Sequence, residues 1–85
     1  MTTFHRNQSA RAFGRALRAA RTERGLSQED LAERGAFDRT YPSLLEHGHR
    51  LPTFYVILQL ARALRMEPVV LFAEAVAQLR KEGRS

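Results

Sequence analysis

Residues 25–48 read GLSQEDLAERGAFDRTYPSLLEHG, and this stretch decides the fold. Ser27 begins a helix with a capping-box-like pattern and an acidic first turn, and Gly35 ends that helix after about two turns. Asp38 can cap a further helix, which Gly48 ends. Two short helices joined by so short a turn are typical of a helix-turn-helix unit, in which the helices cross at a steep angle.

The second helix of this pair, expected over residues 38–47, has two different faces. Tyr41, Pro42 and Leu45 fall within a sector of about 100° and are expected to face the core. The opposite face carries polar side chains that can donate or accept hydrogen bonds at base edges: Arg39, Thr40, Ser43 and His47. A helix with such a face, held away from the body of the domain, fits the major groove of DNA.

The rest of the chain predicts an all-α fold, because no stretch alternates with the period of two that a half-buried strand needs. Residues 1–8 are expected to form a flexible basic arm, and residues 9–82 a single domain of five helices. In addition to the pair above, helices are expected over about residues 9–24, 54–65 and 68–82. In the first of these, Phe13, Leu17 and Ala20 form one buried stripe.

Length and charge narrow the class of protein. The chain has 85 residues, enough for one small domain and too few for two independent cores. With 44% hydrophobic and 27% charged residues, it is predicted to fold rather than to be disordered. The net charge is +5, and residues 1–25 alone hold six Arg and one Glu. Such a domain favours a polyanionic partner, because attraction to phosphates is long-ranged.

Several kinds of site are not expected. Cysteine is absent, which excludes a disulfide framework and a thiolate zinc site. The longest apolar run, residues 69–73, is far shorter than the roughly 20 residues that span a bilayer, so we expect a cytoplasmic protein without membrane association. The histidines of residues 46–49 are too few for a tetrahedral metal site. We expect no cofactor, no small-molecule ligand and no enzymatic activity, because no set of catalytic residues has the required spacing.

Residues 17–71 resemble the phage-repressor and Cro-type helix-turn-helix proteins, the XRE family of bacterial transcriptional regulators. The resemblance is carried by Leu17-Arg18-x-x-Arg21, Gly25-Leu26-Ser27-Gln28-Glu29-x-Leu31-Ala32, Asp38-Arg39-Thr40-Tyr41-x-Ser43-x-Leu45-Glu46-x-Gly48, Pro52-Thr53 and Leu60-Ala61-x-Ala63-Leu64. It implies a five-helix, repressor-like DNA-binding domain with its helix-turn-helix at the second and third helices.

The resemblance implies base contacts at the start of the third helix. Arg39 and Thr40 occupy positions where the family reads base edges, and Arg39 could donate bidentately to O6 and N7 of guanine. A phosphate contact or a pair with Asp38 is the alternative for Arg39. Ser43 and Leu44 are further candidates for base contacts, with Leu44 placed against a thymine methyl group.

The phosphate contacts are expected around the same helix. Gln28 opens the second helix and resembles the family's phosphate clamp, and a plain surface Gln is the alternative. Arg11 and Arg15 could also reach the DNA backbone, although a solvated helix face explains them equally well. The predicted phosphate contacts are Gln28, Tyr41, His49, Arg50, Thr53, Arg11 and Arg15.

The resemblance also implies a structural ion pair between Arg21 and Glu46, partly buried between the first and third helices. Two positions depart from the family pattern. Ala36 stands where the family usually has Gly, and a positive φ there would cost about 1 kcal/mol. Pro42, counted from Asp38, is the fourth helical residue, so we expect it to remove one first-turn hydrogen bond.

A single module offers few base contacts, and family members dimerise on palindromes with recognition helices about 34 Å apart. The helix over residues 68–82 is the expected dimer interface, unless its apolar side chains only cover the first helix. The predicted interface residues are Phe72, Ala75, Val76 and Leu79. The sequence thus predicts a homodimeric repressor or autoregulator that binds double-stranded DNA, with a restriction-modification controller as a close variant. The alternative is a protein-partner-binding module, such as an antitoxin, that uses this last helix.

Overall fold

The computed structural model describes residues 4–82, and all regular structure in that range is helical. The helices are α1 (Arg6–Glu23), α2 (Gln28–Gly35), α3 (Tyr41–Glu46), α4 (Phe54–Leu64) and α5 (Pro68–Glu82). The predicted all-α fold with five helices is therefore confirmed.

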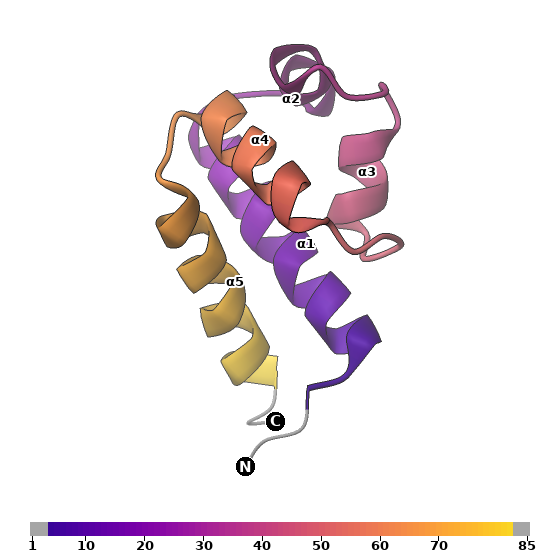
Figure 1. Cartoon of the computed structure of the whole chain (residues 1–85), viewed down its shortest axis with the longest axis vertical. Helices are drawn as coiled ribbons and strands as arrows, with labels where there is room; N and C mark the ends of the chain where they lie inside the picture. The colour runs from indigo at the N-terminus through magenta and orange to yellow at the C-terminus, as the bar shows by residue number, and fades with distance from the viewer. Residues whose placement is uncertain (1–3, 83–85) are drawn as a thin grey trace.

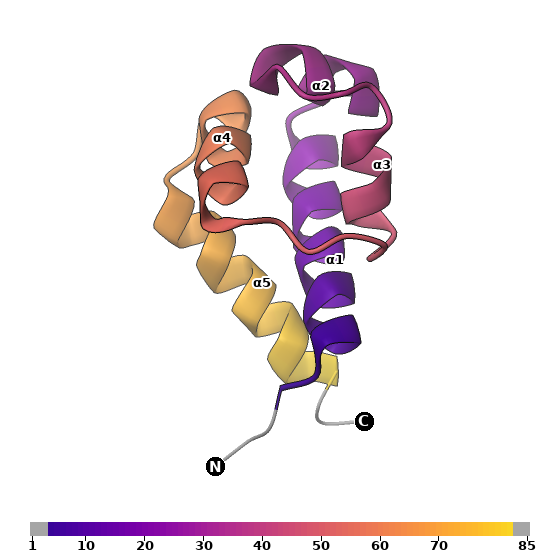
Figure 2. The same cartoon turned by 45° about the vertical axis from the view of Figure 1, so that its right-hand side comes forward.

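Helix α1 is the central element of the fold. It packs against α5 along one side and against α3 along another, and α2 closes one end by packing on α3 and α4 (Figures 1 and 2). Helix α4 lies against α5 and α2, so the five helices do not form an up-and-down bundle. This arrangement leaves α3 at the edge of the molecule.

The core is built from the apolar stripes that the sequence predicted. Phe13, Leu17 and Ala20 of α1 are buried, as expected. They meet leucines contributed by each of the other four helices: Leu31, Leu45, Leu60, Leu64 and Leu71. Because every helix buries at least one leucine in the same cluster, the five helices share one hydrophobic core.

The start of α2 follows the local signals of the sequence, whereas Gly35, which was expected to stop this helix, is its last residue. The Ser27 hydroxyl accepts a hydrogen bond from the Asp30 N–H at 2.9 Å, and the Asp30 carboxylate accepts one from the Ser27 N–H at 2.8 Å. This capping box satisfies two of the free donors at the start of α2. Ala36 ends the helix with φ at 56°, so the family's usual Gly is replaced here by a residue in the less favourable left-handed conformation.

The starts of α1 and α3 differ from the prediction. Helix α1 begins at Arg6 rather than at residue 9, so residues 6–8, expected in the arm, form its first turn. Ser9 does not cap the helix, because it lies inside α1, where its hydroxyl donates to the His5 carbonyl one turn back at 2.9 Å. Residues 1–3 of the predicted arm lie outside the described residues.

Helix α3 begins at Tyr41 rather than at Asp38 because the Asp38 side chain holds a turn of its own. Its carboxylate accepts hydrogen bonds from the backbone N–H of Thr40 at 2.9 Å and from the Thr40 hydroxyl at 2.7 Å. Pro42 consequently lies in the first turn of α3, where a missing N–H costs no intrahelical bond. The predicted loss of a hydrogen bond at Pro42 was wrong.

Candidate nucleic-acid interface

The turn between α2 and α3 carries the first two predicted base-contacting residues. Arg39 and Thr40 both lie just before α3, and the Arg39 side chain is 80% exposed. Ser43 and Leu44 lie on α3 and are half-buried. The four predicted base contacts therefore lie along one short segment, in which Arg39 and Thr40 are exposed.

The turn before α3 is fixed by its own hydrogen bonds. Asp38 binds both the backbone and the hydroxyl of Thr40, and the backbone N–H of Tyr41 donates to the Asp38 carbonyl at 3.0 Å. The bonds from Thr40 also lower the pKa of the Asp38 carboxyl below its usual value, because they stabilise the charged form. The backbone that presents Arg39 is thus well defined before any ligand binds.

The Arg39 guanidinium is paired with Glu29 of α2, not with Asp38. Both side chains are exposed, and the pair joins the two helices of the unit across the outside of their turn. Sequence reasoning missed this contact. Residues 29 and 39 are not at a helical spacing, so no periodic pattern indicates that they meet.

A partly buried ion pair between Arg21 and Glu46 ties α1 to α3, as the resemblance implied. The Arg21 Nε and Nη2 atoms lie 2.6 and 3.0 Å from the two carboxylate oxygens, and the side chains are 11% and 3% exposed. Arg21 also donates to the Leu26 carbonyl at 2.7 Å. The hydrogen bond with Glu46 raises the pKa of the Arg21 guanidinium above its usual value, because it stabilises the charged form.

Gln28 extends this network to the start of α2. Its side-chain nitrogen donates to the Glu46 carboxylate at 3.1 Å, and the residue is half-buried. It is therefore not a plain surface glutamine, and the contact orients its amide at the N-terminus of α2. The role of Gln28 as a phosphate clamp stays a prediction.

The loop after α3 and the start of α4 present three more of the predicted phosphate contacts. His49 and Arg50 are exposed, and the Arg50 guanidinium donates to the neighbouring His49 carbonyl at 3.2 Å. Thr53 caps α4, and its hydroxyl accepts a hydrogen bond from the Val56 N–H at 3.1 Å. These residues follow α3 directly in the chain, so they border the same edge of the domain.

Tyr41 lies partly in the core, as predicted. Its ring packs against Phe37 with a centroid distance of 5.5 Å, and burial raises the pKa of its hydroxyl. The hydroxyl makes no hydrogen bond within the described part of the chain, which leaves it able to contact a phosphate.

The Arg11 and Arg15 side chains are engaged by α5. Their guanidinium groups lie 3.1 and 3.0 Å from the carboxylate of Glu82 on α5, and Arg15 also bonds Gln78 at 3.3 Å. The hydrogen bonds from both arginines lower the pKa of the Glu82 carboxyl. These two arginines therefore fasten α5 to α1, and their phosphate contacts stay a prediction. No pattern in the sequence indicates this pairing, because Glu82 is 71 residues from Arg11.

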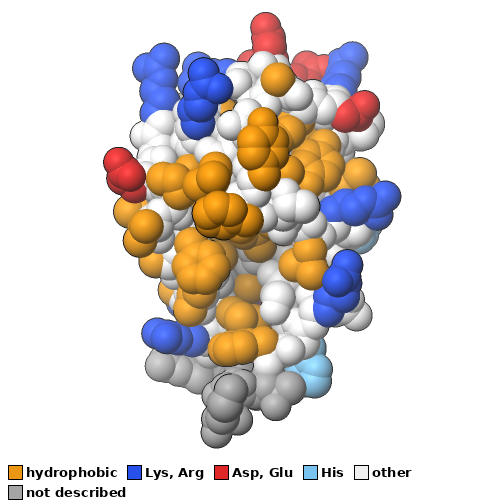
Figure 3. All heavy atoms as spheres, viewed as in Figure 1, with side chains coloured by type: hydrophobic (Ala, Val, Ile, Leu, Met, Phe, Trp, Pro, Cys, Tyr) orange, Lys and Arg blue, Asp and Glu red, His pale blue; other side chains and the backbone are white. Residues whose placement is uncertain are grey.

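A second surface, distinct from the α2–α3 unit, is apolar. Large hydrophobic side chains of α4, α5 and the N-terminal segment are exposed: Phe4, Phe54, Tyr55, Leu58, Val69, Val70 and Phe72. Figure 3 shows hydrophobic side chains gathered over this face. This surface is therefore a candidate for association with another molecule.

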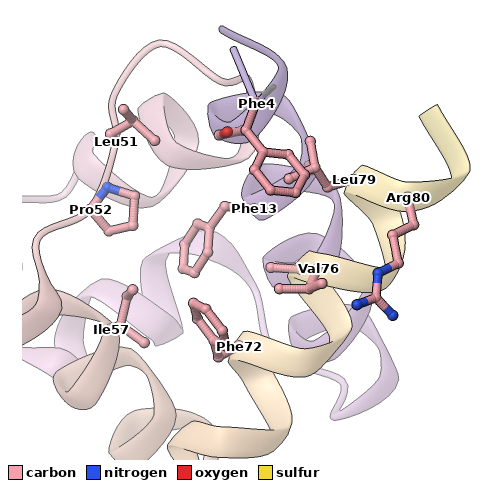
Figure 4. A pocket seen from close by; sticks show the side chains of 12 residues that line it. Phe4, Phe13, Leu51, Pro52, Ile57, Phe72, Val76, Leu79 and Arg80 are labelled. Atoms are coloured by element: carbon pink, nitrogen blue, oxygen red, sulfur yellow. The ribbon is translucent and has the colours of Figure 1, made fainter. Parts of the chain in front are cut away.

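An apolar groove of about 450 Å³ lies within this surface (Figure 4). All four predicted dimer-interface residues, Phe72, Ala75, Val76 and Leu79, line it, and α1 contributes Phe13 to its floor. Val76 and Leu79 are half-buried, whereas Phe72 is 57% exposed. The α5 side chains therefore cover α1 in part and still leave apolar surface uncovered.

Metal-ligand clusters and membrane-spanning helices are both absent from the described residues. Within residues 4–82, no group of three or more His, Cys, Asp or Glu side chains is arranged to hold a metal ion. None of the helices in the described range combines the length and the apolar character needed to span a membrane.

Comparison with known proteins shows which family and which solved structures this chain is similar to. Residues 12–75 match the helix-turn-helix domain family. The uncharacterized HTH-type transcriptional regulator y4dJ of Sinorhizobium fredii is 43% identical over 51 residues, which are 60% of this chain and 66% of that protein. The uncharacterized HTH-type transcriptional regulator Rv0474 of Mycobacterium tuberculosis is 37% identical over 62 residues, 73% of this chain but only 44% of that protein.

Solved structures show the same arrangement of helices. The restriction-modification controller protein C.AhdI from Aeromonas hydrophila is 45% identical, with a TM-score of 0.71 over 73% of this chain and 94% of that one. The restriction-modification controller protein C.Esp1396I, solved as a tetramer in complex with its natural 35-base-pair operator, is 28% identical. Its TM-score is 0.76, over 84% of this chain and 93% of that one.

Proposed function

This chain belongs to the helix-turn-helix domain family, and on that premise we propose that it is a transcriptional regulator that binds double-stranded DNA in a sequence-specific manner. The observation that carries the proposal is the segment from Arg39 to Leu44, which is rigidly held at the edge of the domain and presents its arginine to solvent. A segment of this kind can enter a major groove without any change in the core. Relatives named as transcriptional regulators support a regulatory rather than a catalytic role, exercised in the cytoplasm where the DNA lies.

In the proposed complex, Arg39 reads a guanine and the surrounding donors bind phosphates. Arginine matches the O6 and N7 acceptors of guanine with two parallel hydrogen bonds. Gln28, Arg50 and the start of α4 then fix the register of the domain on the duplex without reading sequence. The net charge of +5 adds attraction that is independent of sequence and that weakens as salt is raised.

The test is selection of bound DNA from a random pool, followed by salt titration and by the variant Arg39→Ala. Wild-type protein should enrich a palindrome. Arg39→Ala should lose about 1–3 kcal/mol of discrimination at one base pair of each half-site. Arg39→Lys is the matched control, because it keeps the charge but not the planar fork, so it should restore overall affinity and not discrimination.

We further propose that the protein acts as a homodimer that uses the apolar groove on α5. Support comes from the exposure of Phe72 and from the need for a second set of base contacts to reach useful specificity. The identity of 45% to C.AhdI favours the narrower assignment to a restriction-modification controller.

The dimer is tested by sedimentation of Phe72→Asp. Wild-type protein should sediment as a dimer at tens of micromolar, and Phe72→Asp as a folded monomer, because the charge would be buried in the interface. Ala73→Asp adds the same charge at an exposed position outside the groove and should remain dimeric. Monomeric wild-type protein would contradict the dimer, and a failure to enrich DNA would favour a protein-partner-binding role for this apolar face.

A further inference from the structure

The contact between Glu29 and Arg39 has a consequence for base recognition. Glu29 lies in the first turn of α2, which the Ser27–Asp30 capping box holds in place. Arg39 extends from the turn that Asp38 fixes. Both ends of the ion pair therefore start from rigid backbone, although the side chains themselves are 62% and 80% exposed.

The ion pair occupies only part of the Arg39 guanidinium. Arginine has five N–H donors in a planar fork. Only Nη2 contacts Glu29, and Nε and Nη1 bond no other group within residues 4–82. The group thus keeps enough free donors to bind both acceptors of a guanine while Glu29 holds one of its nitrogens.

A free arginine side chain has many rotamers, and ordering them on binding costs free energy. A carboxylate that restricts these rotamers beforehand reduces that cost for one geometry of contact. The carboxylate lowers this ordering cost only for a base that fits the restricted geometry. It therefore changes the specificity of binding more than the total affinity.

We propose that Glu29 is a positioning residue for base recognition, which orients the Arg39 guanidinium across the α2–α3 turn toward the guanine that Arg39 reads. The inference rests on the proposed function. Glu29 itself contacts no base, and its own negative charge near the phosphates weakens binding to every sequence equally.

The experiment compares two DNA sites for each variant. One is the selected operator, and the other is the same operator with the guanine pair read by Arg39 replaced by an A·T pair. Glu29→Gln should lower the ratio of the two affinities about two- to fivefold, the size of effect that an exposed ion pair can exert. In the Arg39→Ala background, Glu29→Gln should leave the ratio unchanged, because no guanidinium remains to be oriented.

Glu33→Gln is the matched control. Glu33 is exposed one turn further along α2 and borders the same surface hollow as Glu29 and Arg39, but it forms no ion pair with Arg39. Its removal takes away the same charge from the same helix. Glu33→Gln should therefore raise affinity for both DNA sites together and leave their ratio unchanged, and neither variant should alter the melting temperature.

Three outcomes would overturn the proposal: an unchanged ratio in Glu29→Gln, a higher ratio, or a fall that persists in the Arg39→Ala background. A higher ratio would mean that the ion pair holds Arg39 away from DNA. These outcomes differ from those expected if the proposed function itself is wrong. In that case wild-type protein would enrich no DNA, or Arg39→Ala would discriminate between the two sites as well as wild type. Either result would also contradict the role proposed for Glu29.

Discussion

Arg21→Ala should lower the free energy of unfolding by about 3–5 kcal/mol, the usual effect of removing one partner of a buried ion pair. The variant leaves the Glu46 carboxylate, whose side chain is 3% exposed, without its main cation. It also removes the donor that satisfies the Leu26 carbonyl. For a domain of this size the melting temperature should fall by more than about 10 °C.

Thermal unfolding measures this effect, with Arg18→Ala as the control. Arg18 lies on the same helix but is exposed, and its side chain has no ion-pair partner within residues 4–82. Its replacement should change the melting temperature by little. DNA binding by Arg21→Ala should weaken only as the folded fraction falls, because Arg21 faces α3 rather than solvent. An unchanged melting temperature would show that the Arg21–Glu46 pair does not stabilise the fold.

The features predicted correctly from the sequence are those that local rules determine. The Ser27–Asp30 capping box, the two-turn length of α2 and the buried stripe of α1 each depend on spacing within one helix. The same holds for the core-facing side of α3, where Pro42 and Leu45 are buried. Neighbours in the chain determine these features, so one sequence suffices to predict them.

The features missed depend on contacts between distant residues or on competing local bonds. The start of α3 moved to Tyr41 because the Asp38 side chain bonds Thr40 instead of capping the helix, and both patterns are compatible with the same residues. The pairing of Arg15 with Glu82 depends on how α5 crosses α1. Periodicity within one helix does not predict how two helices cross, so the sequence indicated only a charged face on the first helix.

Gly14 is a further position whose importance the structure reveals. It lies inside α1, is buried, and faces the backbone of α3. A glycine in the middle of a helix lowers helix stability by about 1 kcal/mol relative to alanine, and such a residue often marks a close approach of two backbones. Here it lets the end of α3 lie directly on α1, which sets the position of the segment that presents Arg39.

Gly14→Ala should therefore destabilise the protein, although alanine is the better helix former. A Cβ at position 14 would lie 2.5 Å from the carbonyl oxygens of both Leu45 and Glu46, and these backbone atoms cannot rotate away. We expect a loss near the upper end of the about 1–3 kcal/mol that overpacking costs, measured by chemical denaturation. α3 should also shift, which weakens specific DNA binding even in the folded fraction.

Ala19→Gly is the matched control for Gly14→Ala, because it makes the opposite exchange at an exposed site of the same helix. It should cost about 1 kcal/mol through helix propensity alone. If propensity governed position 14 as well, Gly14→Ala would stabilise the protein by a similar amount. The sign of the change thus separates the two explanations, and a stabilised Gly14→Ala variant would mean that α1 and α3 are not in backbone contact at this position.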